Sequence, residues 1–149
     1  APEELHLEWR VPYRPGVLRA VGLMDGAKVC ECERATAGAP AALALSADRA
    51  AIRVDRGDAA FVTAAVLDSA GRLCPLADTT IEFAIEGEAR LIGVDNGDPE
   101  SHLDFKGRRM KALSGLCLAV VQSAGQPGEA VLTAKAEGLQ PARIALAFA

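Results

Sequence analysis

Aromatic and histidine side chains are scarce in this chain, which has 149 residues but one Trp, one Tyr, four Phe and two His. Its 16 Lys and Arg are outnumbered by 20 Asp and Glu, so no basic surface of the kind that binds nucleic acid is expected. No apolar run approaches the roughly 18 residues of a membrane-spanning helix. Half of the residues are nonetheless hydrophobic, mainly Ala, Val, Leu and Ile, so the chain can bury a core.

Histidine and cysteine also fail to form the spacing of a metal site. Of the four cysteines, Cys30 and Cys32 lie two apart in a strand-like run, whereas Cys74 and Cys117 stand alone. Thiols two apart on a strand are about 6.5–7 Å from each other, too far for an unstrained disulfide. A zinc site normally needs two close pairs or added histidines. We therefore expect ordinary buried or half-buried thiols, and no metal or cofactor.

Residues 5–34 predict a three-stranded β-meander. Leu5 to Tyr13 alternate apolar and polar side chains, the pattern of a half-buried strand, and strands are also expected over 17–23 and 28–34. Asp25-Gly26 between the last two is a strong hairpin-turn signal. Three strands with one apolar face cannot enclose a core, so this segment should pack against another surface. Self-association through residues 5–34 is one way to meet that need.

Small, turn-forming residues at 35–41 predict a linker, which divides the chain into 1–36 and 37–149. The second part alternates short apolar runs with Gly, Pro and Asp turns, and no convincing helix is expected. Strands are predicted over 42–46, 52–54, 59–67, 80–86, 91–94, 116–123, 131–137 and 142–148. The predicted fold is thus all-β: an immunoglobulin-like β-sandwich at 37–149, preceded by the short meander.

Polar groups concentrate between residues 95 and 111, within a strand, loop and strand that span 90–123. The weak binding candidates of this loop are Asn96, Asp98, His102, Phe105 and Arg109. A calcium site is one hypothesis, although the spacing does not fit an EF-hand. A sugar-contacting surface is another, with Phe105 as the one ring able to stack. The favoured interpretation is a structured loop whose acidic and basic halves pair with each other, cap backbone groups and dock against a neighbouring domain.

No catalytic group is predicted. His102 could act as a general base, but no Ser or Cys nucleophile is identifiable beside it. Glu82 and Glu86 lie four residues apart on one strand face, about 13 Å, which exceeds the separation in either class of glycosidase and indicates solvated edge residues. Trp9 and Tyr13 could hold a sugar, but buried anchors at a domain junction are the favoured interpretation.

The segment 90–123 resembles the C-terminal region of bacterial glycoside hydrolase family 2 enzymes, chiefly the β-galactosidase-like ones. The resemblance rests on Gly93, Asn96-Gly97-Asp98-Pro99, Ser101-His102, Phe105-Lys106, Arg109, Ala112, Gly115-Leu116 and Leu118. Residues 7–22 and 25–29 likewise look like the end of the small β-domain that precedes the immunoglobulin-like one in those enzymes. Departures from the family pattern are Leu103, Leu23-Met24 and Gln122.

The resemblance implies a parent protein that is a retaining exo-glycosidase, with two catalytic glutamates on an upstream (β/α)₈ barrel. Nothing in this chain matches that barrel, so no catalytic residue is carried over. The chain is expected to be a non-catalytic accessory module whose partners are the other domains of the parent glycosidase. The alternatives are a carbohydrate-binding module and a bacterial immunoglobulin-like adhesion domain, although no internal repeat supports the latter. A periplasmic or secreted parent is favoured, although residues 1–8 lack the features of a signal peptide.

Overall fold

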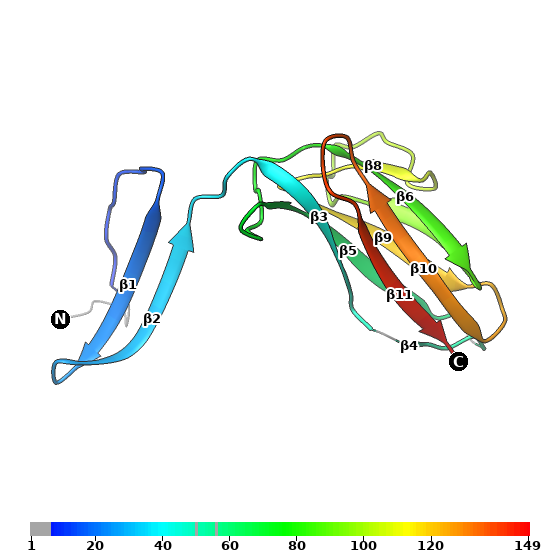
Figure 1. Ribbon diagram of the computed structural model, residues 1–149, viewed down its shortest axis with the longest axis horizontal. Coiled ribbons are helices and arrows are strands. Elements are labelled where there is room, and N and C mark those ends of the chain that lie inside the picture. Colours follow the sequence, from blue (N-terminus) through cyan, green and yellow to red (C-terminus); the bar gives the residue numbers. More distant parts are fainter. Residues whose placement is uncertain (1–6, 50, 56) are drawn as a thin grey trace. The chain divides into compact units, whose positions relative to one another are not determined.

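The computed structural model describes residues 7–49, 51–55 and 57–149, and it divides the chain into two compact units, Ala1–Thr36 and Ala37–Ala149 (Figure 1). All regular structure in the described residues is β-strand, with no helix among them. In particular, none of the described residues forms a helix of the length and hydropathy needed to cross a membrane. The all-β prediction is therefore confirmed, and each unit can be taken by itself.

The first unit contains an antiparallel hairpin of β1 (Val17–Met24) and β2 (Ala27–Ala35). Asp25 and Gly26 both have positive φ, 51° and 80°, which is the backbone of the tight turn predicted from this dipeptide. No side chain of either strand is fully buried. One face carries charge, where Arg19 contacts Glu31 at 3.1 Å and Glu33 at 2.9 Å.

The prediction of the meander's first strand is wrong for the residues that the structure describes. Residues 7–13 have no strand structure, and residues 5 and 6 lie outside the described residues. Alternation alone cannot make a strand, because a strand also needs a neighbour for its backbone groups, and Pro12 has no N–H to offer. Trp9 and Tyr13 are accordingly 69% and 79% exposed, so no residue in the described part of the chain covers them as anchors.

The second unit is a sandwich of two sheets. Its strands are β3 (Pro40–Ala47), β4 (Ala51–Ile52), β5 (Ala59–Asp68), β6 (Thr80–Gly87), β7 (Ala89–Asp95), β8 (Arg109–Lys111), β9 (Leu116–Ser123), β10 (Gly128–Lys135) and β11 (Ala142–Phe148). One sheet has the order β4-β11-β10-β6-β8 and the other the order β3-β5-β9-β7. The predicted sandwich is confirmed. The predictions missed β8, which lies at the end of the polar loop.

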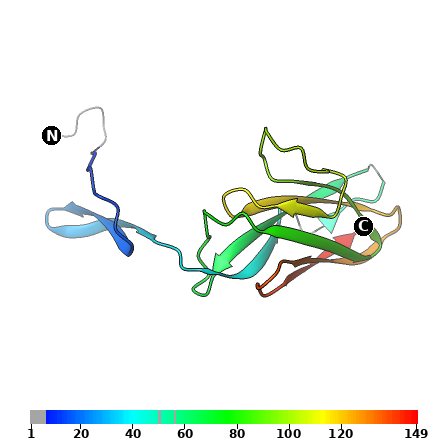
Figure 2. The ribbon, with the colours of Figure 1, turned by 90° about the horizontal axis from the view of Figure 1, so that it is seen from above.

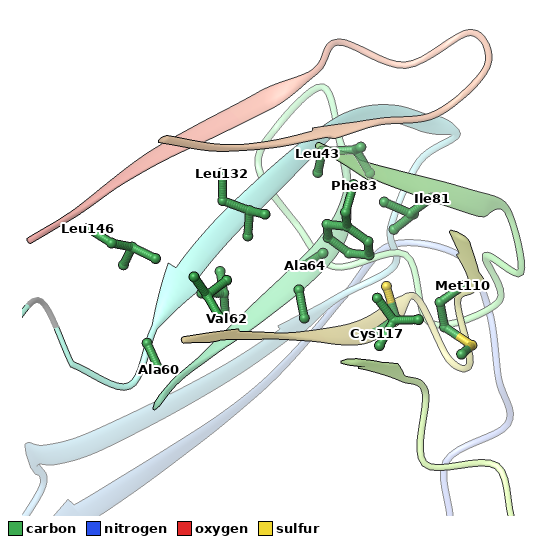
Figure 3. Close-up of a cluster of buried hydrophobic side chains, with 14 of the residues drawn as sticks. Leu43, Ala60, Val62, Ala64, Ile81, Phe83, Met110, Cys117, Leu132 and Leu146 are labelled. Atoms are coloured by element: carbon green, nitrogen blue, oxygen red, sulfur yellow. The ribbon is translucent and has the colours of Figure 1, made fainter. Parts of the chain in front are cut away.

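The core lies between these sheets, where inward side chains of both layers meet (Figure 3). Val62 and Ala64 of β5 face Leu132 of β10, and Phe83 of β6 lies beside them. On β6 the predicted alternation is confirmed, since Ile81 and Phe83 are 0% and 1% exposed while Glu82 is exposed. Alternating burial of this kind fixes which side of each strand faces outward.

A buried carboxylate anchors the start of the sandwich. Asp68 accepts backbone N–H bonds from Gly38 at 2.8 Å, Ala70 at 2.9 Å and Arg72 at 2.8 Å. These bonds, that from Gly38 foremost, lower the pKa of the Asp68 carboxyl below its ordinary value. The charged form is thus the one that holds the 68–72 turn and the beginning of the unit.

Candidate functional site

The polar loop of residues 96–108 joins β7, at the edge of one sheet, to β8, at the edge of the other. Figure 2 shows it in yellow-green, projecting from the body of the sandwich. The carbonyl of Phe105 accepts the Val94 N–H at 2.9 Å, and that of Arg108 accepts the Phe83 N–H at 2.8 Å. The loop therefore covers backbone groups that an edge strand would otherwise expose.

Short-range turns hold the first half of this loop. The Asp95 carboxylate accepts the N–H groups of Asn96 and Gly97, at 2.6 and 2.9 Å. The Asn96 side chain accepts from Asp98, and the Asp98 carboxylate from Glu100, at 3.0 and 2.9 Å. Bonds of this kind from Asp and Asn to the backbone two residues on are typical of turns. The predicted capping of backbone groups by this loop is confirmed.

The carboxylates of the loop do not converge on a common point. Each of the bonds above is made to a neighbouring amide, and Asp104 likewise accepts the Lys106 N–H at 2.8 Å. Within residues 7–49, 51–55 and 57–149, no group of three or more His, Cys, Asp or Glu side chains could hold a metal ion. The calcium hypothesis therefore gains no support from the described residues.

The basic half of the loop pairs outside it. Lys106 donates to the Ile92 carbonyl at 3.1 Å, and Lys111 contacts Asp78 at 2.7 Å. The Lys111 ammonium lowers the pKa of the Asp78 carboxyl. Among the described residues no ion pair joins the loop's acidic half to its basic half, so that part of the interpretation is wrong. Arg109 and Lys111 pair elsewhere because β8 places them opposite Glu82 and Thr80 of β6.

Arg109 lies apart from the other candidates, on the outer face of the five-stranded sheet. It contacts Glu82 at 3.1 Å, and Glu82 is also opposite Lys135 on β10. These three charges border a shallow depression of about 220 Å³, lined by Thr80, Glu82, Arg109, Lys135, Ala136 and Glu137. Sequence reasoning missed Glu82 as a partner of Arg109, because β8 was not predicted and their pairing depends on it.

Glu82 and Glu86 do project from one face of β6, as predicted. The edge position is wrong for Glu82, which pairs with both β8 and β10, whereas β8 does not reach Glu86. In the sheet β6 lies between β10 and β8. Glu86 contacts Arg143 of β11 at 4.0 Å, and both Glu82 and Glu86 remain exposed. Their partners are arginines on β8 and β11, so the two glutamates are not arranged as an acid and base pair.

The remaining candidates occupy separate positions on the loop. Asn96 and Asp98 are half-buried and used in turns, and Asn96 also donates to the Lys111 carbonyl at 2.9 Å. His102 is exposed, and Phe105 is 41% exposed. None of these four lines the depression beside Arg109. The structure therefore does not gather the five predicted residues into one site.

The four cysteines fall into two classes. Cys74 and Cys117 are buried, as expected, and burial raises the pKa of the Cys117 thiol to about 12. Cys30 and Cys32 are exposed on the hairpin, so the expectation of burial is wrong for them. The reason is that no second layer among the described residues covers either face of the hairpin.

Comparison with known proteins finds a family match in each unit. Residues 43–145 match the family model described as glycoside hydrolase family 2 C-terminal domain 5, and residues 1–30 match a domain of unknown function, DUF4982. A curated β-galactosidase from Bacteroides ovatus is 44% identical over 140 residues, which cover 94% of this chain and 16% of that protein. A β-galactosidase from Thermoanaerobacter pseudethanolicus is 34% identical over 118 residues, 79% of this chain and 14% of the relative.

Solved structures give the same relationship. A glycosyl hydrolase family 2 member from Bacteroides cellulosilyticus superposes with a TM-score of 0.87 at 35% identity, over 95% of this chain and 18% of that one. A family 2 β-glucuronidase superposes with a TM-score of 0.78 at 29% identity, over 93% of this chain and 15% of that one. The chain spans less than a fifth of the length of these relatives. It belongs to the glycoside hydrolase family 2 C-terminal domains, in the class shared by β-galactosidase-like and β-glucuronidase-like enzymes.

Proposed function

We propose that this chain is a non-catalytic accessory module of a family 2 glycoside hydrolase, whose catalytic barrel lies outside these 149 residues. The observation that carries the proposal is the family match over residues 43–145. The chemistry of the described residues supports it. The loop carboxylates are used in turns, and the two exposed glutamates of β6 pair with arginines. A glycosidase needs two carboxyl groups facing one bond across an enclosed site.

The substrate class we propose for the parent is β-galactosides, hydrolysed with retention. Its support is the 44% identity to a protein named a β-galactosidase and the resemblance of residues 90–123 to β-galactosidase-like enzymes. β-Glucuronides are the competing class, because a relative at 34% identity over 96 residues, from Formosa agariphila, is named a putative β-glucuronidase. The accessory role itself does not depend on which sugar is cleaved.

Residues 1–36 are, in this proposal, the last strands of the domain that precedes the sandwich. The match of residues 1–30 to a second domain model supports it. So does the exposure of the hairpin, since two strands without a covering layer are marginal in water. Trp9 and Tyr13 would then be buried by the rest of that domain. Pairing with a second copy through residues 5–34 is the alternative use of the same strands.

The test compares three proteins: the 149-residue chain, the longer parent polypeptide, and the parent shortened to end at residue 36. Each is assayed with nitrophenyl β-galactoside and nitrophenyl β-glucuronide. We expect no hydrolysis by the chain alone, hydrolysis of the galactoside by the parent, and reduced activity or thermal stability in the shortened form. Hydrolysis by the isolated chain, or a parent inactive on every glycoside tested, would overturn the proposal.

A carbohydrate-binding role is a second candidate, favoured by the projecting loop, in which Phe105 is 41% exposed and His102 is also exposed. Calorimetric titration of the chain with galactosides and β-linked oligosaccharides, with and without calcium, tests it directly. Saturable heat that is lost in Phe105→Ala but kept in Phe61→Ala, an exposed ring elsewhere on the sandwich, would establish this role. Absence of heat at millimolar sugar would remove it and leave the accessory role.

A further inference from the structure

The outer face of the four-stranded sheet is unusually apolar at its centre. Along β5 and β9 every second residue points away from the core, because its neighbours are buried. The strand register then brings outward residues side by side: Phe61 lies opposite Val120, and Ala65 opposite Leu116. We call this surface the apolar face, and its members are Phe61, Ala65, Leu67, Leu116, Leu118 and Val120.

The apolar face carries no charge of its own. Over the described residues of β5 and β9 the one charged side chain is Asp68, which is buried. Charges appear on the neighbouring strand, where Arg90 and Asp95 of β7 are exposed. The outer face of the other sheet is different, since Glu82, Glu86, Lys135 and Arg143 stand exposed on its three central strands.

An uncharged apolar centre bordered on one side by charges is similar to the apolar core and polar rim of a protein–protein interface. The contiguity of the face matters, because single exposed apolar residues are normal whereas patches mark contacts. Phe61 and Leu116 are 45% and 38% exposed, so they have surface left to bury. A sugar would find one hydroxyl, that of Thr63, at the centre of this face, which is too few polar groups to orient it.

We infer that the apolar face docks against another domain of the same polypeptide, while the charged face of the five-stranded sheet remains in solvent. This inference rests on the proposed function and names the surface through which the module supports its parent. The relatives extend far beyond the region matched here, which is 14–18% of their length in the four matches described above. A domain on the same chain is held at an effective concentration of about millimolar, far above that of a second copy.

Two matched variants test the inference by thiol footprinting. Ala65→Cys puts a thiol in the apolar face, and Ala84→Cys puts one on the outward side of β6 in the other sheet. Each is labelled with N-ethylmaleimide in the 149-residue chain and in the longer parent polypeptide, and the modified peptide is quantified by mass spectrometry. We expect both thiols to react in the short chain. In the parent, residue 65 should be protected at least about tenfold, independently of protein concentration, and residue 84 should not.

Several outcomes would overturn the inference. Equal labelling at residue 65 in the short and long proteins would show that the apolar face is free. Protection already present in the 149-residue chain would make a segment of this chain the occupant. Protection that grows with concentration, together with a doubled mass in light scattering, would make it a second copy. Failure of the parent to hydrolyse any glycoside would refute the proposed function while leaving the labelling pattern interpretable.

Discussion

Both units are built from β-strands, but they bury very different amounts of apolar side-chain surface. In the hairpin no side chain of β1 or β2 is fully buried, whereas the sandwich buries large side chains such as Phe83, Ile52 and Leu132 to 1% exposure or less. Burial of apolar surface is the main favourable contribution to folding, so the stability of this chain resides in its second unit. Alternation and turns are enough to form strands, but a second layer is needed to make them stable.

The largest contrast between the units should appear in thiol reactivity. Cys30 and Cys32 are exposed, while Cys117 is buried with a thiol pKa raised to about 12. At pH 8 the thiolate fraction of a thiol with this pKa is about a thousandfold below that of an ordinary cysteine with pKa about 8.5. We expect an aromatic disulfide reagent to modify two thiols rapidly in the folded chain and all four in denaturant. Equal modification rates for all four cysteines under native conditions would contradict this prediction.

A core truncation should destabilise one unit and spare the other. Phe83→Ala removes a side chain 1% exposed in the sandwich, which costs about 3–5 kcal/mol in the free energy of unfolding. Leu18→Ala in the hairpin, at a position 56% exposed, should change it by less than about 0.5 kcal/mol. Urea unfolding followed by circular dichroism measures both. Comparable losses from the two variants would mean that the hairpin is also part of a core.

Substitution of turn glycines tests the same difference between the units, with a smaller expected change in the free energy of unfolding. Gly115, at φ 78°, is buried, and an added Cβ would lie 2.3 Å from the Cys74 carbonyl oxygen. Gly115→Ala should therefore cost at least about 1–3 kcal/mol, since a backbone clash adds to the left-handed conformation. Gly26, at φ 80°, has open space around it, so Gly26→Ala should incur only the strain of the left-handed conformation, about 1 kcal/mol, without an added clash. Thermal melts of the two variants decide between these outcomes.

The smallest expected effect is a pH dependence. The folded pKa of Asp68 is lowered by backbone bonds, so its contribution to stability is present above the unfolded value of about 3.9. It is lost as the pH falls through the folded pKa. Asp68→Asn should be less stable than the natural chain at pH 7, and the difference should shrink as the pH falls below about 3.9. Asp25→Asn in the hairpin turn serves as the control, with no change at either pH.

Residue patterns predicted most of the strands but not their partners. The period of two located β6 and the turns located the hairpin, because both signals are local. By contrast, the strand expected at 5–13 fails over its described residues, since the alternation is present and the neighbouring strand is not. Strand β8 was missed because three residues with one inward side chain, Met110, are too short to show a period.

The sequence predicts that the candidate site is a loop, but it does not predict how the candidate residues are arranged in space. The sequence shows that Asn96 and Asp98 belong to turns, because Asn-Gly and Asp-Pro favour particular backbone conformations. It does not show that Arg109 reaches Glu82, 27 residues away, because that contact depends on the pairing of β6 with β8. Nor can it distinguish the two outer faces until the register aligns the side chains of β5 with those of β9.

The anchoring by Asp68 has a mechanical consequence for the connection between the units. Thr36 belongs to the hairpin through its bonds with Gly16, and Gly38 is held by the Asp68 carboxylate. Ala37 alone separates the two attachment points, so the Cα atoms of 36 and 38 are at most about 7 Å apart. Ala37 itself packs against the core of the sandwich. The linker predicted over residues 35–41 is therefore taken up almost wholly by the two units.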